Sequence, residues 1–171
     1  NLKKGELKGQ VETDGERILN SDHVLNLTEF PRRLMIIGAG IIGCEYSAIF
    51  SNFGQTKVYL ADYAERIIPY EDDDISDFVS SHLRANGVKI FQTAHLQKID
   101  KRSDHLEVVL DFADGRSEVV EVDTVLISIG RTPNIESLNL DKIGIEPNER
   151  GVLQTDENCC VTGNIYACGD V

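Results

Sequence analysis

Short apolar runs on either side of a helix-like stretch open the regular part of the chain. Leu34–Ile37 and Val58–Ala61 are continuous apolar runs, a pattern typical of strands that are buried on both faces of a parallel sheet. The stretch 41–53 between them contains no proline and ends at Gly54, which suits the left-handed end of a helix. This order predicts a strand, a helix of about three to four turns and a second strand parallel to the first.

A second helix and a third strand follow. The aspartates at 72–74 place negative charge where a helix would begin, and the helical pattern runs up to Asn86-Gly87. The apolar positions of this predicted helix recur at helical spacing, at Ile75, Phe78, Val79 and Leu83. The apolar stretch 88–91 is expected to form the third strand.

The period of the pattern then changes. From His105 onward apolar and polar residues alternate on both sides of an Asp114-Gly115 turn, which predicts an antiparallel hairpin or meander. Later pieces of regular structure are expected as strands over 124–129 and 165–167, and as loop with short strand pieces over 140–154. The whole pattern predicts an α/β fold with a Rossmann-like parallel sheet and an added antiparallel β-meander.

The length of 171 residues suits one domain with a sizeable core. Residues 1–30 are polar and weakly periodic, so we expect a lead-in segment there and a single domain over 31–171. No apolar run approaches the ~20 residues of a membrane span, and the first residues lack the core of a signal peptide. We therefore expect a soluble, cytoplasmic protein.

Charge and cysteine content narrow the classes of partner. A formal net charge of −12 argues against nucleic acid or an anionic membrane as the main partner. The cysteines show no C-x-x-C spacing and the histidines are scattered, so we expect reduced thiols and no metal site. The cysteines are Cys44, Cys159, Cys160 and Cys168.

The strongest chemical signal is a glycine motif at the start of the first helix. Gly38, Gly40 and Gly43 form G-x-G-x-x-G directly after the first predicted strand, and Ile41 and Ile42 fill its last variable positions. The first glycine permits a tight turn, the second lets the backbone approach a pyrophosphate, and the third allows close helix packing. The alternative is a tight strand–helix turn that binds nothing.

Asp62 turns this motif into a dinucleotide-binding hypothesis. It ends the second predicted strand, where an acidic residue accepts hydrogen bonds from the adenosine ribose and repels the 2′-phosphate of NADP. NAD(H) is therefore the expected cofactor, with the alternatives that Asp62 merely ends a strand or that Arg66 faces a 2′-phosphate. Glu45 falls in the first turn of the helix, and Cys44 is expected to be a small core residue rather than a nucleophile.

Four segments in order, at 38–47, 65–69, 130–134 and 165–171, resemble the pyridine nucleotide-disulfide oxidoreductases. The resemblance runs from about Ile18 to Val171 and covers only the NAD domain of that family. It implies a domain excised from a larger FAD-dependent enzyme, with flanking FAD and interface domains and a homodimeric parent. FAD would be held in the parent only, and no catalytic residue is expected in this fragment.

The resemblance also assigns roles to individual residues. Ile41 would lie between flavin and nicotinamide, Glu45 would bond the nicotinamide carboxamide, and Leu96 would cover the adenine. Gly130 would bring its backbone close to the cofactor, and Asp170 would bond the FAD ribityl chain in the intact protein.

Two further positions bear on the kind of parent. Tyr63 and Pro69 stand where NADP-dependent members carry arginines, which again favours NAD. Pro133 favours a dihydrolipoamide dehydrogenase-like parent over a soluble transhydrogenase-like one.

We thus expect an NAD(H)-binding domain that lets hydride pass between nicotinamide and a flavin, and that is inactive alone. A non-catalytic NAD-binding sensor or assembly module is the alternative. A self-contained dehydrogenase is disfavoured because no His, Lys or Tyr constellation suited to acid–base work stands out.

Overall fold

A computed structural model describes residues 11–131, 133–149, 151–169 and 171. The chain divides into two units, one ending at Ile129 and the other beginning at Gly130. Each unit is described by itself below.

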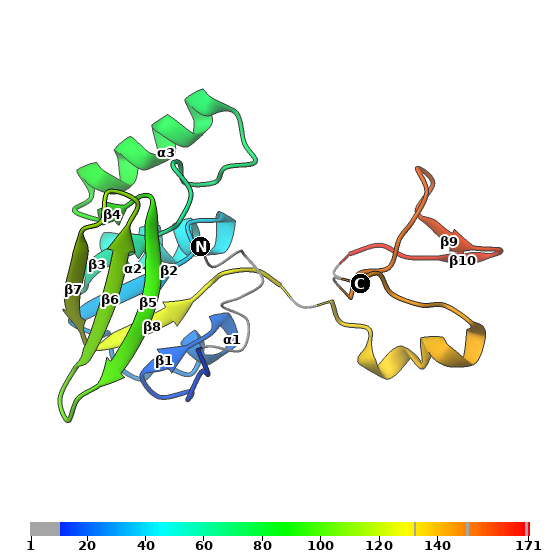
Figure 1. The fold of residues 1–171 in the computed structure, drawn as a ribbon, viewed down its shortest axis with the longest axis horizontal. Helices are drawn as coiled ribbons and strands as arrows, with labels where there is room; N and C mark the ends of the chain where they lie inside the picture. Colours follow the sequence, from blue (N-terminus) through cyan, green and yellow to red (C-terminus); the bar gives the residue numbers. More distant parts are fainter. Residues whose placement is uncertain (1–10, 132, 150, 170) are drawn as a thin grey trace. The chain divides into compact units, whose positions relative to one another are not determined.

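The first unit is organised by a sheet of five parallel strands. Its strands in spatial order are β1 (Ile18–Leu19), β8 (Thr124–Ile127), β2 (Arg33–Ile37), β3 (Lys57–Ala61) and β4 (Lys89–Phe91) (Figure 1). The inner strands are short and almost wholly apolar because both of their faces are covered.

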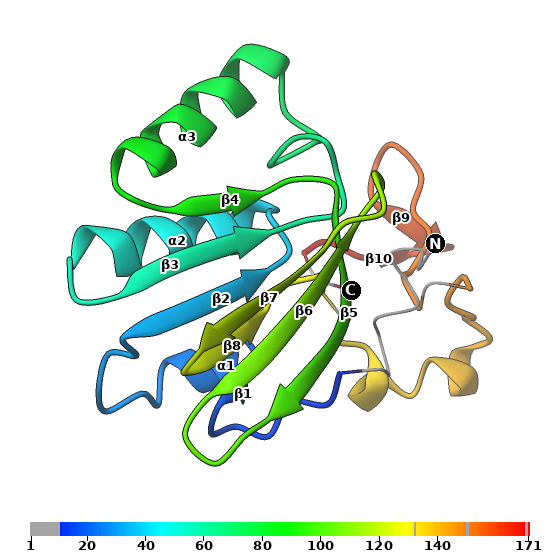
Figure 2. The ribbon, with the colours of Figure 1, turned by 60° about the vertical axis from the view of Figure 1, so that its left-hand side comes forward.

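Two different layers cover the faces of this sheet. The helices α2 (Ile41–Asn52) and α3 (Asp73–Ala85) lie on one side, and the meander lies on the other (Figure 2). The meander consists of β5 (Ala94–Lys101), β6 (Leu106–Phe112) and β7 (Ser117–Val122), all antiparallel. The short helix α1 (Ser21–Val24) follows β1. This arrangement confirms the predicted α/β fold with a parallel sheet and an added meander.

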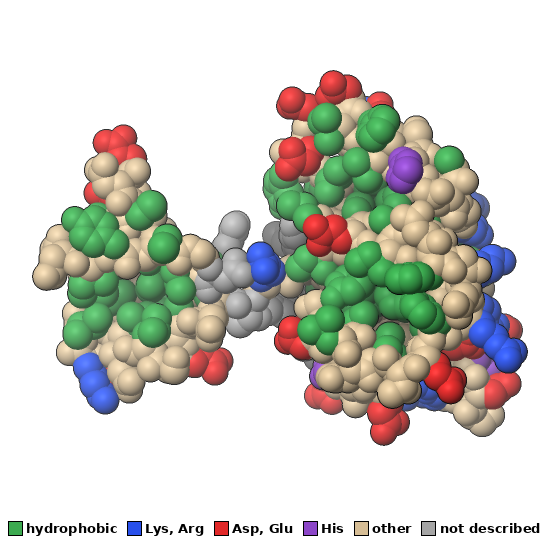
Figure 3. Space-filling view, turned by 180° about the vertical axis from the view of Figure 1, so that it is seen from behind, with side chains coloured by type: hydrophobic (Ala, Val, Ile, Leu, Met, Phe, Trp, Pro, Cys, Tyr) green, Lys and Arg blue, Asp and Glu red, His purple; other side chains and the backbone are tan. Residues whose placement is uncertain are grey.

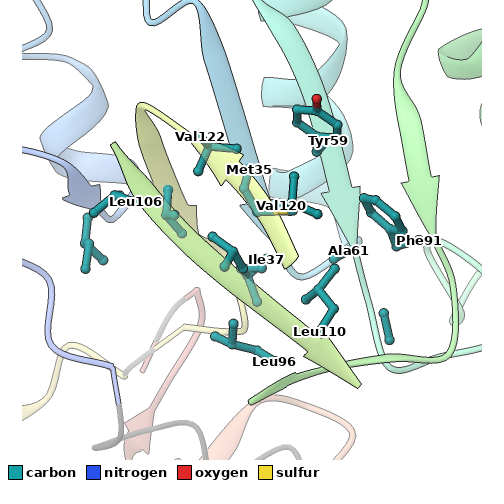
Figure 4. Close-up of a cluster of buried hydrophobic side chains, with 14 residues drawn as sticks. Met35, Ile37, Tyr59, Ala61, Phe91, Leu96, Leu106, Leu110, Val120 and Val122 are labelled. Atoms are coloured by element: carbon teal, nitrogen blue, oxygen red, sulfur yellow. The ribbon is translucent and has the colours of Figure 1, made fainter. Parts of the chain in front are cut away.

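Alternate side chains of each sheet strand point to opposite faces of the sheet and pack into two different hydrophobic cores. On β2, Leu34 and Ile36 belong to the core on the helix side, and Met35 and Ile37 belong to the core on the meander side. Figure 4 shows the meander-side core, where side chains of β2 and β3 meet those of β5, β6 and β7. All four of these β2 side chains are at most 4% exposed, so a change of register in β2 would disrupt both cores at once.

An ion pair fixes the corner where the meander returns to the sheet. The Arg33 backbone N–H donates to Asp123 Oδ2 at 2.8 Å, and its guanidinium reaches Asp123 Oδ1 at 2.7 Å. Burial alone would raise the pKa of the Asp123 carboxyl, but these hydrogen bonds and the charge of Arg33 hold that pKa below its usual value. The pair ties the start of β2 to the residue just before β8.

The second helix is rotated relative to the phase that its apolar pattern suggests. Leu83 is buried as expected, but Ile75 is 47% exposed and Phe78 is 72% exposed. The sheet side of α3 instead buries Ser76 and Ser80. Ser76 donates its hydroxyl proton to the Ile67 carbonyl at 2.8 Å, which satisfies a polar group that would otherwise be costly to bury.

The second unit contains little regular structure. It holds the 3₁₀ helices η1 (Glu136–Leu138) and η2 (Leu140–Ile143) and an antiparallel pair, β9 (Cys160–Thr162) with β10 (Ile165–Tyr166). The expected strand pieces over 140–154 are absent from the described residues, where η2 opens that stretch instead. The division into units at Gly130 falls within the single domain expected over 31–171, and that domain assignment stays a prediction.

Within the segment 1–30, which we expected to be a lead-in, Ile18–Leu19 pair with β8 inside the sheet. Across the part of the chain that is described, no helix has both the length and the apolar character to cross a bilayer. The same part of the chain contains no cluster of three or more side chains able to ligate a metal. All four cysteines are free.

Candidate cofactor-binding site

The glycine motif forms the turn between β2 and α2. Gly38 has a φ of 101°, which strongly favours glycine. Its N–H donates to the Ala61 carbonyl at the end of β3 (2.8 Å). A Cβ at this position would lie 2.6 Å from the Ser128 carbonyl oxygen, so the turn needs glycine for two independent reasons.

The other two glycines differ in their surroundings. A Cβ on Gly43 would lie 1.9 Å from the Gly38 carbonyl oxygen, so this position admits no side chain. A Cβ on Gly40 would meet no atom within 4 Å. Gly43 therefore serves close packing, whereas Gly40 leaves open space beside the backbone, which is the geometry that an approaching pyrophosphate requires.

The N-terminus of α2 is free to receive an anion. Gly40 is the N-cap, no side chain of the described residues caps the helix, and its first turn contains no acidic residue. The first N–H groups of a helix lack partners within the helix and carry partial positive charge. The end of α2 can therefore bind phosphate oxygens without any basic side chain.

Asp62 lies immediately after β3, beside this turn. Its Oδ2 accepts the Ala39 N–H at 2.6 Å and its Oδ1 accepts the Ala64 N–H at 2.8 Å. A carboxylate has about four lone-pair positions, so both oxygens can still accept hydrogen bonds from ribose hydroxyls. The structure thus brings Asp62 and the glycine turn together, as the sequence suggested.

Arg66 forms ion pairs with two aspartates of α3. Its guanidinium pairs with Asp73, and with Asp77 at 3.2 Å, on the first turns of α3. These contacts favour a structural role for Arg66 over the alternative role of facing a 2′-phosphate.

An aromatic pair lies next to Asp62. Tyr63 is 44% exposed, and its ring centroid lies 6.3 Å from that of His95 on β5. Sequence reasoning did not single out His95. The signal was present in the alternation of β5, because Ala94 and Leu96 face the core and His95 must therefore face away from it.

Leu96 is placed differently from its expected role. It is 4% exposed and belongs to the meander-side core (Figure 4). It also helps to line a cavity of about 320 Å³ together with Val11, Ile18 and Ile99, rather than with the glycine turn. A side chain this enclosed offers little surface for covering an adenine ring, and the role that the resemblance assigns to Leu96 stays a prediction.

The exposed side of α2 presents the two residues assigned to the nicotinamide. Ile41 is 63% exposed, Glu45 is also exposed, and their spacing of one helical turn places them on one face. Glu45 was expected in the first turn but lies just beyond it. Ile42 is half-buried.

Cys44 is not a nucleophile in this setting. Burial, and then the charges of Asp62 and Glu45, raise the pKa of its thiol to about 12. The thiol donates weakly to the Ala39 carbonyl at 3.6 Å. It therefore stays protonated near neutral pH and serves the core, as we expected.

Two assigned residues remain, Gly130 and Asp170. Gly130 opens the second unit with a φ of 143°, a conformation that favours glycine. Asp170 lies outside the described residues.

Comparison with known proteins identifies the family of this chain. A model of the family described as pyridine nucleotide-disulphide oxidoreductase matches residues 3–171. The soluble pyridine nucleotide transhydrogenase of Stutzerimonas stutzeri is 41% identical over 162 residues, which cover 94% of this chain and 34% of that protein. That of Chromohalobacter salexigens is 44% identical over 156 residues, which cover 91% of this chain and 33% of that protein.

Solved structures show the same fold. The HOCl-induced flavoprotein disulfide reductase RclA from Escherichia coli superposes with a TM-score of 0.77 at 37% identity, covering 93% of this chain and 35% of its own. LpdA from Mycobacterium tuberculosis superposes with a TM-score of 0.81 at 28% identity, covering 95% and 34%. The chain thus spans about a third of the length of these relatives. Because the family match extends over nearly all of its residues, this chain belongs to the pyridine nucleotide-disulphide oxidoreductase family.

Proposed function

We propose that this chain is the NAD(H)-binding part of an FAD-dependent oxidoreductase, in which nicotinamide and flavin exchange hydride. The observation that carries the proposal is the open, uncapped N-terminus of α2 beside the Asp62 carboxylate. The chain covers about a third of its relatives, and their remaining length leaves room for FAD and interface domains. Such a parent would be a dihydrolipoamide dehydrogenase-like or transhydrogenase-like enzyme.

The described residues fit a bound dinucleotide in two places. The space beside Gly40 and the N–H groups that open α2 would hold the pyrophosphate. Asp62 would accept the hydroxyl protons of the adenosine ribose, and the exposed ring of Tyr63 would lie against the adenine.

The other end of the cofactor would lie along α2. Ile41 and Glu45 are exposed on one face near the beginning of that helix, where the apolar side chain would contact the nicotinamide ring and the carboxylate would accept from its carboxamide. When bound, NADH supplies the hydride. This chain's residues bind and orient the cofactor, and that positioning alone contributes a large part of catalysis.

We expect the chain to bind NADH at least about tenfold more tightly than NADPH, a difference of roughly 1.4 kcal/mol. A 2′-phosphate beside the Asp62 carboxylate sets like charges a few Å apart, which costs on the order of a few kcal/mol at an effective dielectric near 20. NADH instead donates hydroxyl hydrogen bonds to the same carboxylate. Calorimetric titration with both cofactors measures the ratio.

Asp62→Ala is the informative variant for this test. It should lose affinity for NADH and reduce the preference, because both the attraction and the repulsion disappear. Equal affinities in the unmodified chain, or a preference for NADPH, would remove Asp62 from the proposed role.

A further inference from the structure

We propose that Asp62 also acts as a positioning residue, which holds the Gly38–Gly43 turn in its binding conformation before any cofactor arrives. This inference rests on the proposed dinucleotide site and extends it. In this proposal the loop 62–68 forms a bracket around Ala39, which it holds through the N–H and the carbonyl of that residue, and the following contacts define the bracket.

Ala39 is held through both of its backbone polar groups. Its N–H donates to Asp62 Oδ2 at 2.6 Å, and its carbonyl accepts the Ile68 N–H at 2.7 Å. Ala39 itself is 0% exposed, so water does not compete for either bond. Asp62 and Ile68, at the two ends of one loop, thus both hydrogen-bond to Ala39, which lies between Gly38 and Gly40.

The bracket is anchored on its far side as well. Asp62 Oδ1 accepts the Ala64 N–H at 2.8 Å, and the Asp62 carbonyl accepts the Ala94 N–H at 2.9 Å. The Ala64 carbonyl accepts the Thr93 N–H at 3.1 Å. The loop is therefore tied to the connection between β4 and β5, and Asp62 links that connection to the glycine turn.

Ile68 supplies an independent sign that this loop is held in place. Its φ of 40° lies in the left-handed region, which is a genuine outlier for a β-branched residue. Such a conformation persists only where the surroundings determine it, and it is found preferentially at ligand sites. Ile68 is 8% exposed and its neighbour Ile67 is fully buried in the helix-side core, so packing maintains the conformation that aims the Ile68 N–H at Ala39.

The bracket has a consequence for affinity that a simple ribose contact does not have. A turn that is already ordered loses little conformational freedom when a pyrophosphate binds. Weakening the bracket should therefore reduce the affinity even for a ligand that makes no contact with the Asp62 carboxylate.

Asp62→Asn tests this with a side chain of the same shape. Ala39 and Ala64 donate to different oxygens of Asp62, and an amide replaces one of those oxygens by a donor nitrogen, so one of the two hydrogen bonds is lost in the native geometry. The two probes are NADH and an NADH analogue whose adenosine carries 2′,3′-dideoxyribose. Amide hydrogen exchange of Ala39 and Ala64 in the cofactor-free chain supplies a readout that does not depend on binding.

Glu65→Gln is the matched control. It removes one negative charge from the same loop through an exposed side chain and leaves both bonds of Asp62 intact. It also separates charge from geometry, because removing a negative charge near the site should strengthen the binding of a phosphate-bearing ligand.

We expect Asp62→Asn to weaken the binding of NADH by about 30-fold and that of the dideoxy analogue by at least about fivefold. At least one of the two amides should exchange about tenfold faster or more. Analogue affinity within about twofold of the unmodified chain, or unchanged exchange at both amides, would overturn the bracket. Failure of the unmodified chain to bind NADH would instead overturn the proposed function, and the exchange data would still decide on the bracket.

Discussion

The glycines around the N-terminus of α2 meet separate physical requirements. Gly43 excludes a side chain because its position faces the Gly38 carbonyl oxygen at a distance where no Cβ fits. Gly40 faces open space and has a φ of −74°, which any L-residue adopts. One glycine therefore matters to the folded chain itself, and the other matters only when something binds.

We expect alanine to affect stability at one of these positions and cofactor binding at the other. Gly43→Ala should lower the free energy of unfolding by at least about 2 kcal/mol, because backbone must move to admit the Cβ. Gly40→Ala should change it by no more than about 1 kcal/mol, the scale of an altered N-cap, yet should weaken NADH binding at least about tenfold. Urea unfolding and calorimetric titration measure the two effects separately.

The comparison between the two variants carries the test. If Gly40→Ala binds NADH as well as the unmodified chain, the pyrophosphate does not occupy the space beside that residue. If Gly43→Ala unfolds at the same urea concentration as the unmodified chain, the close contact with Gly38 is not a constraint on the fold.

Single residues were predictable from sequence where a local rule applied. The spacing of the glycines and the place of Asp62 at a strand end follow from such rules, and the structure brings these residues together. The bond from Asp62 to Ala39 was not predictable, because it joins side chain and backbone across a whole β-α-β unit. The left-handed Ile68 was equally hidden, since its sequence position carries no turn residue.

At the scale of elements, α3 shows how packing overrides an apolar pattern. Four apolar residues at helical spacing suggested one buried stripe, but of these only Leu83 is buried and Val79 partly buried, while Ser76 and Ser80 complete the buried side of the helix. Small serines permit α3 to lie close to its neighbours, and Ile75 and Phe78 are turned outward. Figure 3 shows apolar side chains exposed on one face of the sheet-containing unit.

This phase can be measured by substitution. Phe78→Asp should change the free energy of unfolding by less than about 0.5 kcal/mol, because its side chain is largely in water. Leu83→Ala should reduce it by about 2 to 4 kcal/mol, because Leu83 is 1% exposed. A loss from Phe78→Asp as large as that from Leu83→Ala would mean that α3 packs in the phase that the sequence pattern suggested, because that pattern buries both residues.

Element boundaries followed from sequence where apolar runs were long enough. The strands β2, β3, β4, β6, β7 and β8 and the helices α2 and α3 all begin and end near the expected positions. The strand β1 was missed because two residues carry no period, and β5 was missed because its outer half is polar and exposed. Both need partners that lie far away in the sequence, β8 and β6 respectively.

At the scale of the whole molecule, the strand order gives β8 a central place. It is the last strand of the sheet in sequence, yet it lies between β1 and β2 and pairs with both. Both cores depend on it, since Val125 belongs to one and Leu126 to the other. The sheet-containing unit is complete only when residues 124–127 are present.

Two truncations test this dependence. A chain that ends after Ile129 should unfold cooperatively in urea, because all five strands, both cores and the meander are retained. A chain that ends after Asp123 should lack a cooperative transition, because β1 loses its partner and β2 loses one of two. Equal midpoints for the two truncations would show that β8 adds little to the sheet.

The late position of β8 also matters while the chain is being made. At synthesis rates of roughly 5–20 residues per second, on the order of ten seconds separate the emergence of β2 from that of β8. During that interval β2, with its apolar run Leu34–Ile37, presents an unpaired edge to solvent or to another nascent chain. Ribosomes that translate the same mRNA bring such unpaired β2 edges close together. We therefore expect the nascent chain to depend on chaperones more than the folded chain does.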